Sequence, residues 1–243
     1  MIPYHHIETV FLDVGNTLIS IDFDWVAEEL GTRGVRCDAA QLRRSEAAAR
    51  PGYSMRCFVE GLKESTDLFR LYLSCIVEPL EAAARLPRDE LDALITELRR
   101  VLRPDEEAST LWRSVMPQVP EALARMQQLG LRLVVVSNSD GTVERSLVRA
   151  GLRPFMTAVI DSTHAGFEKP DPRIFTAALA ASGSRPDRTL HIGDLYHADV
   201  VGARASGLHA LLLDPYGDWP PQDCERAPDL WEVANRLAHA RAP

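Results

Sequence analysis

Five residues with side chains suited to chemistry follow the predicted strands of this sequence. Asp13 and Ser137 each come directly after a hydrophobic run that is typical of a buried strand, and Asp194 comes one glycine after the predicted strand 189–192. Lys169 precedes a Pro-Asp-Pro turn, and Asp199 comes five residues after Asp194. The carboxyl ends of parallel strands lie at one edge of a sheet, and ligands bind at that edge. We therefore expect these five side chains to share one site.

Three carboxylates, one hydroxyl and one ammonium at one sheet edge suit phosphoryl transfer. Neighbouring carboxylates repel one another, and Mg²⁺, which prefers oxygen ligands, relieves that repulsion. An aspartate can form an aspartyl-phosphate, and a lysine and a hydroxyl can hold phosphoryl oxygens. Taken singly, each residue also has an explanation as a turn residue, surface cation or helix cap. Those separate explanations fit the whole set poorly, since Lys169 and Lys63 are the two lysines of the chain.

The elements that would carry these residues follow from hydrophobic periodicity. From about residue 117 onward, helical patterns alternate with short buried-strand patterns, which favours a parallel sheet covered on both faces. Residues 21–104 instead carry four helical patterns and no strand pattern. We therefore predict an α/β fold: a Rossmann-like parallel-sheet core of residues 1–20 and 105–243, with an all-helical cap domain inserted at 21–104.

Local signals place several helix ends and one loop. Asp24 is expected to cap the first helix of the insert, and a second helix is expected at 39–49, ended by Pro51. A third is expected at 56–77. Near the end of the chain, the proline-containing stretch 220–228 is predicted to be a loop.

Composition excludes several classes of partner. The chain has a net charge of −8 at pH 7, with 46% hydrophobic and 26% charged residues, which disfavours a general nucleic-acid or anionic-membrane surface. The four cysteines are too far apart for a zinc site.

No signal peptide is evident, and no apolar run approaches the roughly 18 residues of a membrane span. We expect a cytoplasmic protein that binds a small phosphorylated molecule; the sequence leads to no expectation about its oligomeric state.

Four motifs resemble those of the haloacid dehalogenase-like (HAD) hydrolase superfamily, in the subgroup with a helical C1-type cap. The order of these motifs, with a helical insert between the first and the second, is similar to the order in that family. The resemblance covers nearly the whole chain. The motifs are Asp13-Val14-Gly15-Asn16-Thr17-Leu18, Ser137-Asn138, Lys169-Pro170-Asp171-Pro172, and Gly193-Asp194 through Asp199. The resemblance implies a Mg²⁺-dependent hydrolase, in this case a phosphatase that works through an aspartyl-phosphate.

The resemblance also implies a role for each matching position in the metal centre. Asp13 would be the nucleophile and, together with Asp194, would bind Mg²⁺ through its carboxylate. Gly15 would offer its backbone carbonyl to the metal. Asp199 would support the metal waters or Lys169.

The phosphate-binding positions are implied in the same way. Thr17 and Ser137 would bind phosphoryl oxygens, and Asn138 is assigned to the same group. Lys169 would orient both the nucleophile and the phosphate.

One position departs from the family pattern. Most phosphatases of the family carry a second aspartate two residues after the nucleophile, as acid for the leaving alcohol, and this chain has Gly15 there. A positioned acid–base group is worth about 10²- to 10⁴-fold in rate, so slow turnover of alkyl phosphates is expected. An acyl or aryl phosphate would need no acid. Otherwise another residue would have to donate the proton, and the candidates are His164, Asp140, Asp22 and Asp24.

Three other functions remain open at this point. A binding or regulatory protein could keep the fold without turnover, and Gly15 favours that hypothesis. A 2-haloacid dehalogenase needs no leaving-group acid, but it has no use for the carboxylates Asp194 and Asp199. A phosphonate hydrolase would need a lysine from the cap, for which Lys63 is the candidate.

Overall fold

The computed structural model describes residues 1–60, 67–104 and 111–241. The chain divides into two compact units, one formed by Met1–Ser20 with Arg113–Pro243 and the other by Ile21–Trp112. The crossings between the units therefore fall at 20/21 and 112/113. The second boundary proposed from the sequence, at 104/105, adjoins residues 105–110, which lie outside the described part of the chain.

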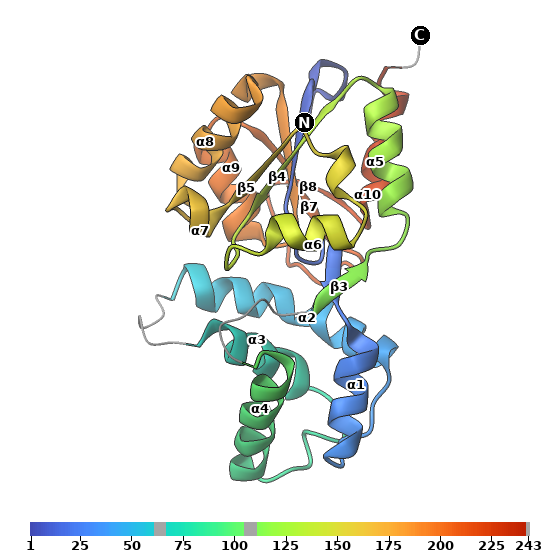
Figure 1. Ribbon diagram of the computed structural model, residues 1–243, viewed down its shortest axis with the longest axis vertical. Helices are drawn as coiled ribbons and strands as arrows, with labels where there is room; N and C mark the ends of the chain where they lie inside the picture. Colours follow the sequence, from blue (N-terminus) through green and yellow to red (C-terminus); the bar gives the residue numbers. More distant parts are fainter. Residues whose placement is uncertain (61–66, 105–110, 242–243) are drawn as a thin grey trace. The chain divides into compact units, whose positions relative to one another are not determined.

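The first unit is built on a six-stranded parallel sheet, drawn in Figure 1. Its strand order is β5-β4-β1-β6-β7-β8, and every neighbouring pair is parallel. The predicted Rossmann-like α/β core is confirmed. The strands are β1 (Thr9–Leu12), β4 (Arg132–Ser137), β5 (Ala158–Asp161), β6 (Thr189–Gly193), β7 (His209–Leu213) and β8 (Glu225–Ala227).

Helices cover the two faces of this sheet. Helices α5 and α10 pack together, and α8 and α9 lie on the opposite face in Figure 1. Strands β1 and β6 are buried along their full length because they lie in the middle of the sheet. The remaining helical bounds of this unit are α5 (Val119–Gln128), α6 (Val143–Arg149), α7 (Ser162–Ala165), α8 (Pro172–Ser182), α9 (Gly202–Ala205), α10 (Leu230–His239), the π-helix η4 (Tyr196–Val201) and the 3₁₀ turns η1 (Tyr4–His6), η2 (Arg153–Phe155) and η3 (Pro186–Arg188).

Strand β8 corrects the loop that was predicted for 220–228. Its three residues lack a hydrophobic alternation, so the sequence carries no strand signal there. Pairing with β7 supplies the missing reason, because it satisfies backbone groups that a loop would leave to water. Glu225 then accepts hydrogen bonds from the Ile2 backbone N–H (2.7 Å) and from the Tyr4 hydroxyl (2.8 Å).

The second unit is helical, as predicted for the insert. Its helices are α1 (Phe23–Thr32), α2 (Ala39–Phe58), α3 (Leu68–Val77) and α4 (Arg88–Leu102). Their apolar faces form one core, in which Leu30, Leu73, Ile76 and Ile95 are fully buried. Burial of each such side chain stabilises the fold by about 1.5–3 kcal/mol. A two-stranded sheet of β2 (Ile19–Ile21) and β3 (Trp112–Val115) carries the chain between the units.

Two predicted helix ends in this unit are wrong. The N-cap of α1 is Asp22, whose carboxylate accepts the Trp25 backbone N–H at 3.0 Å, and Asp24 lies inside the first turn. Helix α2 does not stop before Pro51 but continues to Phe58. The residues at 42, 46, 50 and 54 are all buried, so the buried side of the helix continues past Pro51. Packing on that side outweighs the loss of the backbone hydrogen bond that proline removes.

The third predicted helix is therefore divided. Residues 56–58 belong to the end of α2, and α3 begins at Leu68 after the N-cap Asp67. Residues 61–66 of the prediction lie outside the described residues. Among the helices that the structure describes, none has the length and apolar character needed to cross a membrane.

Candidate active site

Asp13 lies at the carboxyl end of the central strand β1. Its backbone N–H donates to the Ile192 carbonyl at 3.0 Å, which continues the pairing of β1 with β6 by one residue. The chain then turns sharply, because the N–H groups of Leu18 and Ile19 both donate to the Val14 carbonyl, at 2.9 and 3.0 Å. The carboxylate of Asp13 is thus fixed at the sheet edge, and the residue is 8% exposed.

Lys169 joins two of the predicted site residues. Its Nζ donates to Asp13 Oδ1 and to Asp199 Oδ1, each at 2.6 Å, and the lysine is only 3% exposed. Burial disfavours its charge, but the two carboxylates hold the pKa of Lys169 above its ordinary value. The structure therefore brings together a buried cation and two buried carboxylates that are 156 and 30 residues away in sequence.

Those two carboxylates are affected differently. Burial raises the pKa of Asp13 above its ordinary value, and the Lys169 ammonium only partly opposes the rise. Burial acts on Asp199 too, but Lys169 and a hydrogen bond from His191 hold the pKa of Asp199 well below its ordinary value. The opposite directions follow from the contacts, since more hydrogen-bond donors favour the charged form of Asp199 than favour that of Asp13.

Asp199 sits in the π-helix η4, four residues after its N-cap Leu195. Its Oδ1 lies 3.0 Å from His191 Nε2, and its Oδ2 accepts the Leu195 backbone N–H at 2.9 Å. A Cβ on Gly193 would lie only 2.2 Å from Asp199 Cγ. The glycine of the Gly-Asp motif therefore leaves room for the Asp199 carboxylate.

Asp194 completes a cluster of three carboxylates. Oxygen atoms of Asp13, Asp194 and Asp199 all lie within 4.8 Å of one another, and all three residues are buried. Asn16 adds a long hydrogen bond of 3.4 Å from its Nδ2 to Asp194 Oδ2. Two of the three carboxylates share the single positive charge of Lys169, so the cluster carries an excess of negative charge. A divalent cation that prefers oxygen ligands would balance this excess. The donor set thus suits Mg²⁺.

Two further predicted residues lie in the turn after β1. Gly15 forms an isolated bridge with Ile19, and Asn16 adopts a left-handed backbone with φ of 51°. Thr17 is 2% exposed, and within the described part of the chain its Oγ1 has no hydrogen-bond partner. A buried hydroxyl without a partner is costly, and a phosphoryl oxygen would supply the partner.

Ser137 is the last residue of β4, the neighbour of β1, and Asn138 follows it. Leu12 of β1 pairs with Val135 of β4, so this register places Ser137 beside the residue that follows Asp13. Ser137 is 4% exposed. The side chain of Asn138 contacts the backbone of Lys169. Its Nδ2 donates to the Lys169 carbonyl at 2.9 Å and its Oδ1 accepts the Lys169 N–H at 2.7 Å. Asn138 thus holds the backbone of Lys169, and its assignment to the phosphate-binding group stays a prediction.

The segment of Lys169 is also packed closely from α9. A Cβ on Gly202 would lie 2.8 Å from Pro170 Cα and 2.9 Å from Phe175 Cε2. Lys169 is thus positioned by side-chain hydrogen bonds from the end of β4 and by a close backbone approach from α9.

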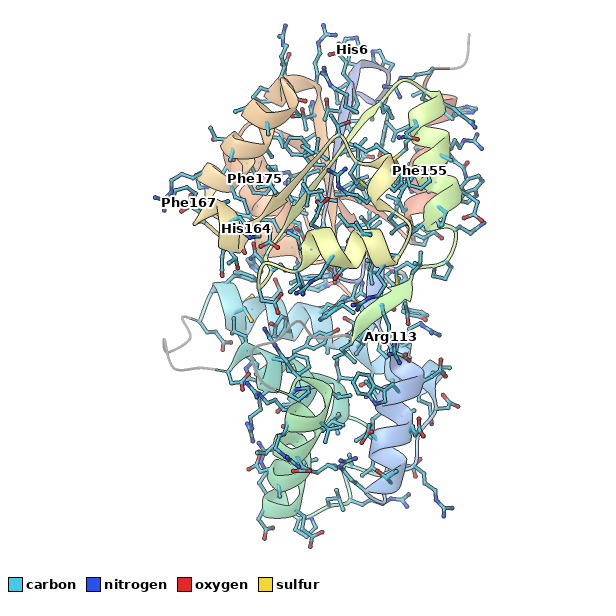
Figure 2. The ribbon with its side chains drawn as sticks, viewed as in Figure 1. His6, Arg113, Phe155, His164, Phe167 and Phe175 are labelled. Atoms are coloured by element: carbon cyan, nitrogen blue, oxygen red, sulfur yellow. The ribbon has the colours of Figure 1, made fainter. Side chains whose placement is uncertain are left out.

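The four candidate proton donors have contacts of their own. His164 lies on α7 (Figure 2), where it approaches the 139–142 turn near Gly141. Asp140 accepts the Thr142 hydroxyl at 2.7 Å. Asp22 caps α1, and Asp24 is exposed in its first turn.

His191 is the residue that reasoning from the sequence missed. It lies in the middle of β6, is fully buried, and contacts the ring of Phe175 edge-on at 5.1 Å between centroids. Burial lowers the pKa of its imidazole. The available signal was a histidine inside an otherwise apolar strand, two residues before the glycine of the Gly-Asp motif.

Comparison with known proteins identifies the family. The model of the haloacid dehalogenase-like hydrolase family matches residues 7–207 of this chain. The chain belongs to this family, and the resemblance inferred from the four motifs is confirmed at that level.

Three curated relatives show the extent of the similarity. Haloacid dehalogenase-like hydrolase domain-containing protein 3 of Xenopus laevis is 33% identical over 187 residues, which cover 77% of this chain and 75% of that protein. The protein of the same name from Bos taurus is 38% identical over 119 residues, 49% of this chain and 47% of that protein. Phosphoserine phosphatase of Thermus thermophilus is 35% identical over 158 residues, 63% and 57% respectively. The match thus spans about half the length of the latter two relatives.

Solved structures share the fold over nearly the whole chain. The HAD-hydrolase YfnB from Bacillus subtilis, crystallised with magnesium, has a TM-score of 0.65 and 21% identity, covering 95% of this chain and 98% of that one. A HAD phosphatase from Thermococcus onnurineus has a TM-score of 0.55 and 19% identity, covering 97% and 100%. At these identities the likeness concerns the fold.

Proposed function

We propose that this hydrolase is a Mg²⁺-dependent phosphatase that acts on a small phosphorylated molecule through an aspartyl-phosphate. The observation that carries the proposal is the contact of Lys169 with Asp13 and Asp199 at 2.6 Å each, beside the third carboxylate of Asp194. Relatives named phosphoserine phosphatase and glyceraldehyde 3-phosphate phosphatase support this substrate class.

Asp13 and Asp194 would hold the ion by their carboxylates, with the backbone carbonyl of Gly15. When bound, Mg²⁺ would neutralise charge on the phosphoryl oxygens and reduce repulsion among the carboxylates. Asp199 would hold Lys169 beside the ion, since its two oxygens already accept hydrogen bonds from Lys169, His191 and the Leu195 backbone.

Asp13 would act as the nucleophile. Its Oδ1 is engaged by Lys169, so Oδ2 is the oxygen that attacks phosphorus as the bond to the leaving oxygen breaks. Thr17 and Ser137 would donate hydrogen bonds to phosphoryl oxygens, and the Lys169 ammonium would offset their charge. A water molecule would then attack phosphorus, releasing inorganic phosphate and restoring the Asp13 carboxylate.

The glycine at position 15 bears on the choice of substrate. Without a carboxyl group there, the leaving oxygen departs without an acid from this motif, so a phosphate whose leaving group is already a weak base reacts faster. We propose acyl or aryl phosphates as better substrates than alkyl phosphates.

The test is a Mg²⁺-dependent assay with an aryl, an acyl and an alkyl phosphate. Wild-type protein should turn over the first two, and Asp13→Asn should abolish turnover. Asp187→Asn is the matched control, because Asp187 is an exposed carboxylate paired with Arg185, and it should leave the rate unchanged. Absence of wild-type turnover on every phosphate would overturn the proposal.

A second candidate is a binding or regulatory protein that holds phosphorylated molecules without turnover. Gly15 in place of the second carboxylate favours it. In that case a phosphorylated ligand would bind in the presence of Mg²⁺, and no phosphate would be released. The dehalogenase hypothesis is weaker, since it leaves Asp194 unused. Lys63, on which the phosphonate hydrolase hypothesis depends, lies outside the described residues.

A further inference from the structure

We propose that His191 is a positioning residue, which fixes the Asp199 carboxylate so that Lys169 is shared between Asp199 and the nucleophile Asp13. The inference rests on the proposed function and extends it to a residue outside the four motifs. It is carried by the contact of His191 Nε2 with Asp199 Oδ1 at 3.0 Å, made to the same oxygen that accepts Lys169 Nζ.

The Asp199 carboxylate is held from several directions at once. Lys169 and His191 donate to Oδ1, and the Leu195 N–H donates to Oδ2. Gly193 closes the remaining side, as any side chain there would overlap Asp199. Of these groups, His191 comes from the buried middle of β6. Its hydrogen bond therefore restrains the Asp199 carboxylate from within the sheet.

The position of Asp199 matters because one ammonium serves two carboxylates. Lys169 Nζ is equally close to Asp13 and Asp199, at 2.6 Å from each. If Asp199 rotated away, Lys169 would either follow it and leave Asp13 or pair with Asp13 alone. Either change would alter how the nucleophile is oriented, and a small displacement of a reacting group lowers the rate strongly.

The surroundings of His191 argue that it is more than a core residue. The site is fully buried and packs against the ring of Phe175, where an apolar side chain would fit. Of the buried atoms in the described residues, His191 Nδ1 is one that has no hydrogen-bond partner. A buried polar atom without a partner lowers stability, so the hydrogen bond of Nε2 to Asp199 is the contact that an apolar residue could not provide.

The experiment compares His191→Leu, which removes the donor, with His191→Gln, whose amide can reach the position of Nε2 and cannot ionise. Residues that orient ligating or catalytic groups typically contribute about 10- to 100-fold to activity. We expect kcat of His191→Leu to fall about tenfold or more per folded molecule with little change in KM, and His191→Gln to recover most of the loss. His209→Leu, on the neighbouring strand β7, is the matched histidine control and should keep the wild-type kcat.

A double-mutant cycle separates positioning from general packing. In an Asp199→Ala background, His191→Leu should cause no further loss, because its effect acts through the missing carboxylate. If the Leu variant folds poorly, His191→Met takes its place as a flexible apolar replacement. An unchanged kcat in the apolar variant, no recovery with Gln, or the same loss in both backgrounds would overturn the proposal.

A crystal structure of His191→Leu provides a readout that does not depend on turnover. Asp199 should rotate away from Lys169 there and keep its place in His191→Gln. An unmoved Asp199 in the Leu variant would contradict the role of His191, whatever the activity. Lack of wild-type turnover, with Asp199 displaced as expected, would instead contradict only the proposed function.

Discussion

Each of the two units buries charged side chains, and the two groups differ in how their charges are matched. In the helical unit, Glu46 and Arg50 lie one turn apart on α2 with side chains 1% and 6% exposed, and both carboxylate oxygens accept from the guanidinium at 2.7–3.1 Å. In the sheet unit, three carboxylates lie close together, and two of them pair with Lys169.

The difference indicates which group is structural. Glu46 and Arg50 carry opposite unit charges and meet through three hydrogen bonds, so the two charges of this pair on α2 cancel. The carboxylates beside Lys169 exceed its single charge, so their arrangement lowers the stability of the protein alone and suits a cation and a phosphate. A buried charge cluster thus points to function when its own charges do not balance.

The largest expected effect concerns the matched pair. Glu46→Gln leaves the Arg50 guanidinium buried beside a neutral amide, and breaking a buried pair costs about 3–5 kcal/mol. The free energy of unfolding should therefore fall by about 3 kcal/mol in urea denaturation. The control is Glu46→Leu combined with Arg50→Leu, which removes both charges and should cost at most about 1 kcal/mol. Equal losses in the single and double variants would show that the pair does not behave as a matched unit.

Two glycine replacements test whether the carboxylate cluster is packed more tightly than the helical unit. Gly193→Ala places a Cβ against Asp199 and should cost about 1–3 kcal/mol by overpacking, with a loss of turnover. Gly52→Ala on α2 meets no atom within 4 Å and should stabilise the protein by about 0.5–1 kcal/mol. Thermal unfolding measures both changes. A stable, fully active Gly193→Ala variant would contradict the close fit of Asp199.

Gly15→Asp supplies the carboxyl group that the first motif lacks. Gly15 is not among the glycines of the described residues with a positive φ, so its backbone suits an ordinary side chain. Turnover of an alkyl phosphate should rise about tenfold, and that of an aryl phosphate less, because an acid helps most with a poor leaving group. Steady-state assays on both substrates decide. An equal gain on both would show that another group limits the rate.

The smallest expected change in stability concerns the unmatched cluster. Asp194→Asn removes one of three neighbouring carboxylates, so in EDTA it should raise the free energy of unfolding by about 1 kcal/mol. Mg²⁺ should raise the Tm of the wild-type protein by binding the folded state and should have little effect on this variant. Glu46→Gln should keep the Mg²⁺ shift. A metal-free Asp194→Asn protein that is less stable than wild type would contradict the repulsion inferred at this site.

Much of the sheet unit was readable from the sequence because its signals are local. A buried run followed by Asp13, or by Ser137, identifies both the strand and the end that carries the polar group. The signals failed where distant contacts decide the outcome. Helix α2 passes through Pro51 because its buried stripe continues, and β8 exists because β7 offers it a pairing edge.

By itself, the sequence determined the family and the strands that end in polar residues. It also identified Asp13, Lys169, Asp194 and Asp199 as residues that converge at the carboxyl ends of the strands. Only the tertiary structure decided how they share their charges. It joined Lys169 to both Asp13 and Asp199, assigned Asn138 to the Lys169 backbone and placed His191 behind Asp199. The physical reason is that residue types and spacing record local backbone preference, whereas hydrogen-bond partners and burial depend on which distant segments pack together.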